Sequence, residues 1–413
     1  MPVTEADYGG IGRYPMKTIQ ILPSKSDAHR AMICAALSEL TSGKTCQVMC
    51  ETSSQDIEAT EACLAALQTG RPQMCCGESG STLRFLLPVM AALGHRAEFY
   101  PEGRLPQRPL SPLYEELERH GCRLSPQGTV PFTIEGQLEP GIFRIPGDVS
   151  SQYISGLLFA LPILESDSKI VVEGEFQSRP YVNMTVQTLE DFGISIKTID
   201  DGFFIPGGQR YQAPPVYQVE GDWSNGCFWL AAGALTPGGV CVKGLNVKSL
   251  QGDKEILPLL SRFGAKTAVC EGDITVMPSS LYGIDINAAQ IPDMVPILAV
   301  LACGAKGKTT IRNAGRLRIK ESDRLASVSQ VLSNLGASIK ELPEGLEIQG
   351  TGSLAGGRAD GWGDHRIVMM AAIASLICDE KVIITGSQAV KKSYPDFFQI
   401  LEDVGLGNNI ERN

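Results

Sequence analysis

The stretch VQTLEDFGISIKTIDDGFFIPGG (residues 186–208) predicts a helix, a glycine that ends it, and two strands joined by a turn. Leu189 and Phe192 give the helix one apolar face. Gly193 follows, and glycine accepts the left-handed conformation that closes a helix and that a side chain resists. The Asp-Gly pair at 201–202 is a hairpin signal between two strand-like segments. The stretch therefore predicts an α/β unit with at least one helix and a small sheet.

The same helix-plus-glycine pattern returns at nearly constant intervals along the chain. The copies are LYEELERHG (113–121), VQTLEDFG (186–193), ILPLLSRFG (256–264), VSQVLSNLG (328–336) and FQILEDVG (398–405). Successive final glycines are 72, 71, 72 and 69 residues apart, and a weaker copy, CLAALQTG, ends at Gly70. Other helical stretches alternate with these copies, at residues 28–40, 82–93, 152–163, 224–235, 292–303 and 365–378. A period of about 71 in 413 residues predicts close to six units, most simply as two domains of three.

Composition narrows the class of protein. Apolar residues make up 43 % of the chain, which is enough for hydrophobic cores, and the net charge of −10 argues against a nucleic-acid binder with a basic surface. No apolar run reaches the length of about 18 residues that a membrane span needs. Twelve cysteines at irregular spacings and four histidines predict free thiols in a cytoplasmic protein, and no metal site.

Polar and basic residues stand just ahead of the repeated helices. They are Arg108, Ser178 with Arg179, Asp253 with Lys254, the run 320–324, and Lys391 with Lys392. A helix start already favours anions, through its unpaired N–H groups and its dipole, so a cation there does not stabilise the helix. A cation at a helix start instead helps to bind an anion there. Any one of these residues is equally explained as a solvated surface charge, but the set predicts several helix starts around one anion-binding cleft.

Three further segments place small polar or basic residues at helix starts. LPSKSDAHRAM carries Lys25, Ser26 and Arg30, CGESGSTLRFLLP carries Gly80, and GDVSSQYISGLL carries Ser150, Ser151 and Gln152. Small residues let backbone N–H groups approach an oxyanion, although no G-K-[ST] follows and the glycine-rich segment is not a P-loop. Each segment alone is also compatible with plain helix capping.

Carboxylates complete the candidate site. Asp293 lies at the entrance of the apolar helix in IPDMVPILAVLA, and capping is its alternative role. Glu321 lies between Lys320 and Arg324, where it could be a local ion-pair partner. The segment DHRIVMMAAIA opens another apolar helix with His365, for which we expect a capping role rather than that of a base.

These motifs resemble those of the enolpyruvyl transferases. The matching stretches follow the family's order over residues 22–398: LPSKSDAHRA, GESGSTLR, QRPLSPL, GDVSSQYISGLL, SRPYVNMT, VEGDWSNGCFWLAAGA, IPDMVPILAVLA, RLRIKESDRLA, GDHRIVMMAA and KKSYPDFF. The resemblance implies an α/β (α+β) inside-out barrel of two domains, each with three units whose helix N-termini face an interdomain cleft. One domain would span residues 24–220 and carry most contacts to shikimate 3-phosphate. The other would combine 1–23 with 221–413.

The branch of the family that this chain resembles most transfers the enolpyruvyl group of phosphoenolpyruvate to the 5-hydroxyl of shikimate 3-phosphate. The reaction releases phosphate, belongs to the shikimate pathway to chorismate and aromatic amino acids, and is the target of glyphosate. The resemblance implies no cofactor, no metal, no nucleic acid and no membrane partner, and we expect a monomer. It also implies that Asp293, Glu321 and Lys25 are catalytic, which suits the proton transfers that the reaction needs.

The resemblance implies two sets of binding residues. Those for shikimate 3-phosphate are Lys25, Ser26, Arg30, Ser150, Ser151, Gln152, Ser178, Tyr181, Asp293 and Lys320. Those for phosphoenolpyruvate are Lys25, Gly80, Arg108, Gln152, Arg324, Arg366 and Lys392. Glu78 stands where one common form of the family has an asparagine, and Arg316 stands where some relatives have one. Both are left outside the predicted site.

Other assignments remain open at this point. A UDP-N-acetylglucosamine enolpyruvyl transferase would carry a cysteine in a mobile loop, whereas residues 101–112 contain none. An RNA 3'-phosphate cyclase would want a basic surface, which the acidic composition disfavours. Six repeated units could also form a non-enzymatic ring or scaffold, but the cations and carboxylates at the helix starts argue against that.

Overall fold

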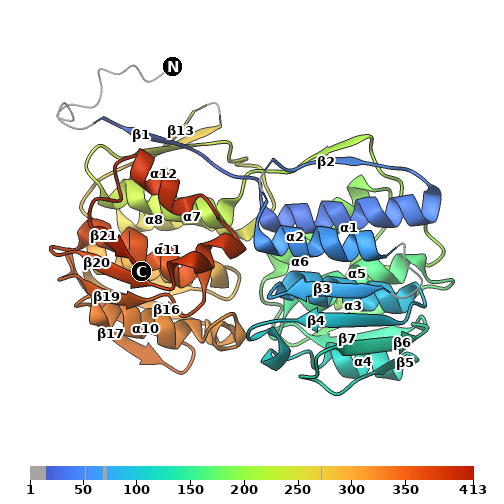
Figure 1. Cartoon of the computed structure of the whole chain (residues 1–413). Coiled ribbons are helices and arrows are strands. Elements are labelled where there is room, and N and C mark those ends of the chain that lie inside the picture. Colours follow the sequence, from blue (N-terminus) through green and yellow to red (C-terminus); the bar gives the residue numbers. More distant parts are fainter. Residues whose placement is uncertain (1–14, 52, 68–71, 271) are drawn as a thin grey trace.

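The chain folds into two lobes that lie side by side (Figure 1). The computed structural model describes residues 15–413 except 52, 68–71 and 271. The buried apolar side chains fall mainly into two large clusters. One gathers residues between 33 and 211, and the other gathers residues 223–406 together with Ile19 and Ile21. These separate cores support the predicted division into 24–220 and 1–23 plus 221–413, which stays a prediction.

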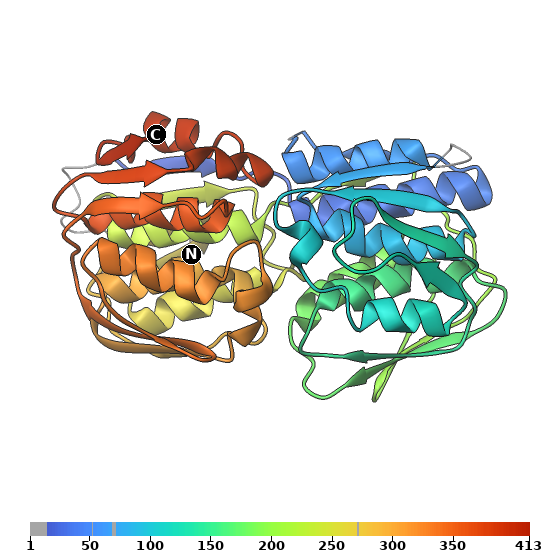
Figure 2. The ribbon, with the colours of Figure 1, turned by 60° about the horizontal axis from the view of Figure 1, so that its bottom comes forward.

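The chain passes between the lobes at two neighbouring points (Figure 2). Pro23 and Gly221 form an antiparallel bridge there. The Ser24 backbone N–H donates to the Glu220 carbonyl at 2.7 Å. The two connections therefore run against each other and tie the lobes together on one side of the cleft.

Four of the six sheets in the described residues share one topology, with a parallel pair followed by an antiparallel hairpin. In the first lobe, the strands of one sheet are, in spatial order, β3 (Gln73–Gly77), β4 (Ala97–Pro101), β6 (Phe132–Gly136) and β5 (Cys122–Leu124), and those of the next are β7 (Ile142–Pro146), β8 (Ser168–Glu173), β10 (Gly202–Ile205) and β9 (Lys197–Ile199). In the second lobe, the strands of one sheet are β1 (Lys17–Gln20), β12 (Val240–Lys243), β14 (Asp273–Met277) and β13 (Lys266–Cys270), and those of the next are β15 (Asp285–Asn287), β16 (Lys306–Arg312), β18 (Gly345–Thr351) and β17 (Ser338–Leu342). The other two sheets keep only parallel strands: β2 (Gln47–Met49) with β11 (Val216–Gln218), and β19 (Gly357–Asp360), β20 (Val382–Thr385) and β21 (Ile410–Arg412). The six predicted units are thus four complete copies and two reduced ones.

Each unit carries two kinds of helix. One kind has more buried residues: α1 (Lys25–Ser42), α3 (Gly80–Ala92), α5 (Ser151–Ala160), α7 (Trp223–Leu235), α9 (Val295–Gly304) and α11 (His365–Ala374). The repeated helices of the sequence pattern, and the weaker first copy, are α2 (Gln55–Ala66), α4 (Leu113–Arg119), α6 (Arg179–Asp191), α8 (Ile256–Phe263), α10 (Arg324–Asn334) and α12 (Phe397–Asp403). Every residue of α9 from Val295 to Cys303 is buried, as expected for a helix that is apolar on all sides. In α8 the buried residues form a single face.

The glycines that end the repeated helices are left-handed, as predicted. Their φ angles are 91° at Gly121, 74° at Gly193, 96° at Gly264, 97° at Gly336 and 71° at Gly405. Gly70, which ends the weaker copy, lies outside the described residues. Among the helices that the structure describes, none is long and apolar enough to cross a membrane.

Candidate active site

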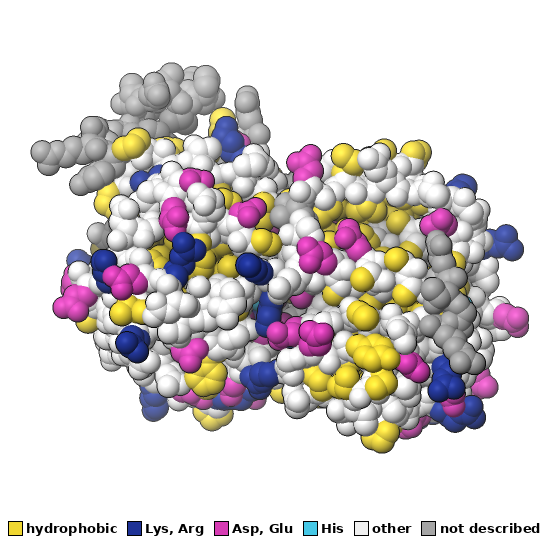
Figure 3. All heavy atoms as spheres, in the orientation of Figure 1, with side chains coloured by type: hydrophobic (Ala, Val, Ile, Leu, Met, Phe, Trp, Pro, Cys, Tyr) yellow, Lys and Arg dark blue, Asp and Glu magenta, His cyan; other side chains and the backbone are white. Residues whose placement is uncertain are grey.

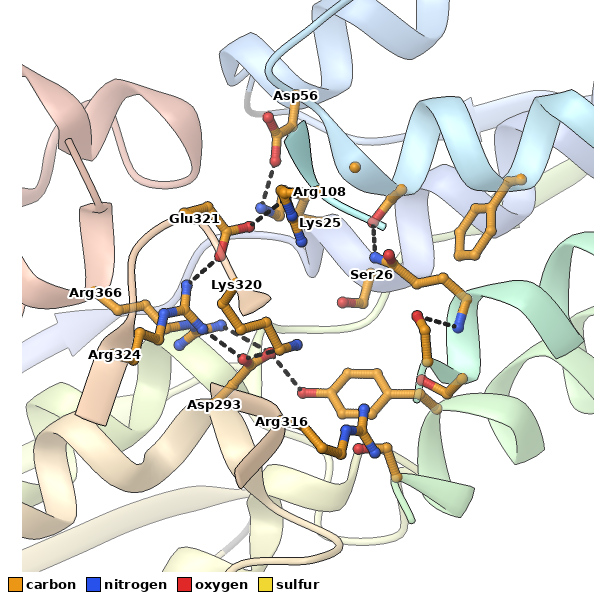
Figure 4. A pocket seen from close by; sticks show the side chains of 18 of the residues that line it. Lys25, Ser26, Asp56, Arg108, Asp293, Arg316, Lys320, Glu321, Arg324 and Arg366 are labelled. Atoms are coloured by element: carbon orange, nitrogen blue, oxygen red, sulfur yellow. Dashed lines mark hydrogen bonds and ion pairs between the residues drawn. The ribbon is translucent and has the colours of Figure 1, made fainter. Parts of the chain in front are cut away.

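One pocket between the lobes gathers every residue of the predicted site except Lys392 (Figure 4). Those that line it are Lys25, Ser26, Arg30, Gly80, Arg108, Ser150, Ser151, Gln152, Ser178, Tyr181, Asp293, Lys320, Glu321, Arg324 and Arg366. Asp56, Ser81, Phe85, Arg316 and His365 also line the pocket, although they were not in the predicted site. Charged side chains of both signs are also visible on the surface where the two lobes meet (Figure 3).

Helix starts from both lobes form the walls of this pocket. The Ser150 hydroxyl caps α5 by accepting the Gln152 N–H at 3.3 Å. Ser178 precedes α6 with a φ of 51°, and its buried hydroxyl has no hydrogen-bond partner among the described residues. A strained residue with an unused buried hydroxyl at a helix start is typical of a ligand contact, because the ligand can supply the missing bond.

Arg324 joins the carboxylates on the second lobe. Its guanidinium donates to Asp293 at 2.7 Å, to Glu321 at 2.7 Å and to Asp364 at 2.8 Å, and the residue is 1 % exposed. Figure 4 shows Arg324 between Asp293 and Glu321. All three of its nitrogens are therefore engaged by carboxylates of its own lobe, so Arg324 fixes their orientation as well as lining the pocket.

Asp293 is ionised in this arrangement. Burial alone would raise its pKa, but Lys320, Arg366 and Arg324 outweigh burial and hold the pKa of Asp293 well below its usual value. The Lys320 ammonium lies 3.5 Å from the carboxylate. The Tyr181 hydroxyl donates to it at 3.3 Å. A carboxylate held in this state can accept a hydrogen bond from a substrate hydroxyl.

Glu321 is also held as a carboxylate. Burial would raise its pKa, but Arg324 and Arg108 lower it well below the usual value. Arg108 reaches Glu321 across the cleft at 3.4 Å, and Arg104 donates to the Glu321 carbonyl at 3.2 Å. Movement of Arg108 would therefore change the proton affinity of Glu321.

The first lobe fixes its own polar residues through hydrogen bonds. The Lys25 ammonium pairs with Asp56 at 2.6 Å. Arg30 is buried and donates to the Thr185 hydroxyl at 2.9 Å and to the Tyr181 carbonyl at 2.8 Å. Arg30 therefore supports the pocket through backbone and hydroxyl groups.

A close approach at the start of α3 requires glycine. A Cβ atom added at Gly80 would lie 2.5 Å from an Arg84 nitrogen and 2.9 Å from an Arg108 nitrogen. Arg84 in turn donates to the Gln152 amide oxygen at 3.2 Å. Gly80 thus leaves room for the guanidinium groups of Arg84 and Arg108 beside the start of α3.

His365 is not the capping residue that we expected, and that interpretation is wrong. The Asp364 carboxylate caps α11 by accepting the Arg366 N–H at 3.0 Å. Burial, followed by the Lys25 charge, lowers the pKa of His365 to about 3, so its ring is neutral near pH 7. Neither ring nitrogen has a hydrogen-bond partner in the described part of the chain, and the ring lines the pocket.

Sequence comparison identifies the family. The family model described as EPSP synthase (3-phosphoshikimate 1-carboxyvinyltransferase) matches residues 68–401. The chain belongs to this family. It is 42 % identical to the 3-phosphoshikimate 1-carboxyvinyltransferase of Clostridium acetobutylicum, over 94 % of each chain. It is 40 % identical to that of Clostridioides difficile, over 96 % of this chain and 98 % of the relative.

Solved structures of lower sequence identity show the same fold. An EPSP synthase from Acinetobacter baumannii superposes with a TM-score of 0.76 at 23 % identity, and covers 95 % of this chain and 97 % of its own. The enolpyruvyl transferase NikO from Streptomyces tendae superposes with a TM-score of 0.74 at 16 % identity, and the match covers 95 % of this chain and 96 % of that one. The family model and the relatives confirm the resemblance and the transferase class, and the solved structures confirm the α/β fold. The scaffold and UDP-N-acetylglucosamine alternatives are set aside.

Two charged residues that the prediction left outside the site lie in or beside the pocket. Arg316, in the 3₁₀ helix η6 (Gly315–Ile319), lines the pocket, and its Nε and Nη1 atoms are buried without partners in the described residues. Its position four residues before Lys320 was the available signal, but Arg316 was left out of the prediction because we expected it to depart from the family pattern. Glu78 pairs with Lys392, the predicted residue that the pocket does not include.

Proposed function

We propose that this chain transfers the enolpyruvyl group of phosphoenolpyruvate to the 5-hydroxyl of shikimate 3-phosphate and releases phosphate. We also infer that it acts as a monomer in the cytoplasm on these two small molecules. One observation carries the proposal: two ionised carboxylates, Asp293 and Glu321, are held by one buried guanidinium in a pocket between the lobes that is rich in cations.

The charge of the pocket suits the two substrates. Each substrate carries a phosphate and a carboxylate, or about three negative charges near neutral pH. Opposite charges about 4 Å apart gain roughly 4 kcal/mol at an effective dielectric of about 20. Both lobes supply cations to the pocket, namely Lys25, Arg108, Lys320 and Arg366. Guanidinium groups also match the forked geometry of carboxylate and phosphate oxygens.

The ring substrate is assigned to the side of the pocket where the buried Ser178 hydroxyl lacks a partner among the described residues. Its phosphate would take the hydroxyls of Ser150, Ser151 and Ser178 and the Lys320 ammonium, which line the same pocket. Tyr181 packs against the ring, and its hydroxyl lies 3.3 Å from Asp293. Asp293 would then accept the proton of the 5-hydroxyl. Ser26, Arg30 and Gln152 complete the walls.

Phosphoenolpyruvate is assigned to the other side, around the start of α3. Arg108 and Arg366 would hold its phosphate and carboxylate, with the Gly80 backbone and Lys25 nearby. One buried nitrogen of Arg366, Nη1, lacks a partner in the described residues and is available to this ligand. Arg324 lies behind these groups and contributes mainly by orienting Glu321.

The chemical steps follow from these positions. Arg108 leaves Glu321 when it binds the anionic substrate, and this raises the proton affinity of the carboxyl group. Protonated Glu321 delivers its proton to the methylene carbon, while the 5-hydroxyl oxygen bonds to the neighbouring carbon and loses its proton to Asp293. Glu321, which took its first proton from solvent, then removes a methyl proton as the carbon–oxygen bond to phosphate breaks, and Asp293 returns its proton to solvent. Lys25 neutralises charge on the departing phosphate.

Phosphate release tests this function directly. Purified protein should liberate inorganic phosphate from phosphoenolpyruvate only when shikimate 3-phosphate is also present. Omission of either substrate is the control, because a phosphatase would release phosphate from one substrate alone. Absence of release with both substrates contradicts the proposed function.

A further inference from the structure

The Glu78–Lys392 ion pair joins the two lobes beside the pocket. Glu78 lies between β3 and α3 on the first lobe, and Lys392 ends the 3₁₀ helix η8 (Ser387–Lys392) on the second. The ammonium lies 2.8 Å from the Glu78 carboxylate and 2.7 Å from the Gly363 carbonyl. The Lys392 side chain is 11 % exposed and that of Glu78 is 39 % exposed. The pair is therefore partly shielded from water.

The neighbours of this pair are pocket residues. Glu78 is two residues before Gly80, and Gly363 is three residues before Arg366, and both of these later residues line the pocket. Both partners of the Lys392 ammonium are therefore close in sequence to residues that line the pocket. Lys392 itself is not among the described residues that line the pocket, and its ammonium is paired with Glu78.

The surroundings hold the Glu78 carboxylate in place. A Cβ atom added at Gly103 would lie 2.5 Å from this carboxyl group, so glycine at 103 makes room for it. Gly103 belongs to the loop that continues to Arg104 and Arg108, which both contact Glu321 across the cleft. Glu78 is therefore packed between its own lobe's loop and the second lobe's lysine.

We propose that Glu78 is an internal competitor for Lys392 and sets the affinity of the site for phosphoenolpyruvate. With the cleft empty, the Glu78 carboxylate takes the place of a substrate anion on Lys392. Phosphoenolpyruvate must displace this carboxylate before it can use the Lys392 cation. Glu78 is thus a positioning residue that acts through Lys392. The inference rests on the proposed function and deepens it.

The inference predicts a change in one Michaelis constant and not in the other. Exposed and partly exposed ion pairs stabilise by an amount equivalent to about two- to five-fold in an equilibrium constant. Glu78→Gln should therefore lower the KM for phosphoenolpyruvate about two- to five-fold and leave the KM for shikimate 3-phosphate unchanged. Lys392→Met should raise the KM for phosphoenolpyruvate, and Glu78→Gln should have no effect in the Lys392→Met background.

A matched control removes a similar ion pair far from the cleft. Glu347 pairs with Lys308 at 2.6 Å between β18 and β16, within the second lobe. Glu347→Gln should change neither KM. A general effect of lost negative charge would change the values for both glutamate variants alike.

Phosphate release gives both KM values, and calorimetric binding of phosphoenolpyruvate gives a second measurement that needs no turnover. An unchanged or higher KM in Glu78→Gln overturns this inference alone, provided that the wild type turns over both substrates. If Glu78→Gln lowers the KM for phosphoenolpyruvate by the same factor in the Lys392→Met background, the inference is also overturned. A wild type that neither turns over the substrates nor binds phosphoenolpyruvate contradicts the proposed function, and the inference with it.

Discussion

Two regions of the cleft differ in how their charges are satisfied. Around Arg324, each guanidinium nitrogen donates to a carboxylate, and Asp293, Glu321 and Asp364 are all fixed. Around Arg316, by contrast, two buried nitrogens have no partner among the described residues. In the proposed function, the first region is a network that orients the two catalytic carboxylates. The second region is a binding surface that a ligand would complete. We therefore expect the carboxylates to be held in place before substrate arrives, and part of the binding energy to come from filling unused donors.

The largest effect should come from the network's proton-transfer group. Glu321→Gln keeps the shape of the side chain but cannot carry the proton, so kcat should fall by about 10²–10⁴. Steady-state phosphate release measures it. Glu341→Gln is the control, because Glu341 pairs with Arg318 outside the pocket. Near-normal turnover in Glu321→Gln would show that another group transfers the proton.

Breaking the network at its centre should destabilise the fold. Arg324→Met leaves the fully buried Asp364 carboxylate without its cation, which costs about 3–5 kcal/mol. Urea unfolding of wild type and variant measures the difference. The exposed pair of Arg123 and Glu135 provides the control, and Arg123→Met should cost less than about 1 kcal/mol. If Arg324→Met and Arg123→Met lowered the free energy of unfolding equally, the buried network would contribute no more to stability than an exposed ion pair, which contradicts this prediction.

The buried carboxyl group of Asp27, which lies outside this network, sharpens the contrast between carboxylates that are paired with cations and those that are not. Burial raises the pKa of Asp27 to about 6. Hydrogen bonds from the Glu220 N–H and the Tyr217 hydroxyl, both 2.9 Å long, lower this pKa but do not cancel the effect of burial. Because the folded pKa is above the unfolded value, protonated Asp27 stabilises the fold below about pH 4 and this contribution disappears as pH rises through 6. Across this pH range the contribution of Asp27 to the free energy of unfolding falls by about 3 kcal/mol.

Comparison with Asp27→Asn isolates this titration. The free energy of unfolding of the wild type, minus that of the variant, should fall between pH 4 and pH 6.5. Urea titrations at several pH values measure it. A difference that is independent of pH would mean that Asp27 titrates normally.

The binding surface should respond with a smaller effect that is confined to one substrate. Arg316→Gln removes a charged donor, and a hydrogen bond to a charged group is worth about 1.5–3 kcal/mol. The KM for shikimate 3-phosphate should rise about 10- to 100-fold, with little change for phosphoenolpyruvate. Arg318→Gln is the control, since Arg318 is already paired with Asp323 and Glu341. Equal changes in both KM values would place Arg316 elsewhere in the mechanism.

The repeated units could be predicted because their signals are local. Helix periodicity and the glycine that follows lie within a few residues of each other, as at Leu189, Phe192 and Gly193. The gathering of helix starts in one pocket also followed from the pattern. The reduced sheets β2–β11 and β19–β21 could not be predicted in the same way, because strand pairing between distant segments leaves little local trace.

The site could be predicted where the family pattern is kept, and less well where it is not. The role of Asp56 was missed because an acidic residue in the first turn of α2 is expected for helix stability alone. The pairing of Lys392 with Glu78 depends on two residues 314 positions apart meeting across the lobes. The unpaired state of Arg316 depends on what surrounds it in space. Sequence spacing contains neither of these facts.

Solvent deuterium tests the central claim that Glu321 exchanges a proton with the methylene carbon. The reaction in deuterium oxide, followed by NMR, should give wild-type product with deuterium at that carbon, because the transient methyl group gains a solvent-derived deuteron before it loses one hydrogen. The Glu321→Gln variant should incorporate deuterium at a rate that falls together with its kcat. Wild-type product free of deuterium at the methylene carbon, or Glu321→Gln with an undiminished incorporation rate, would contradict the account.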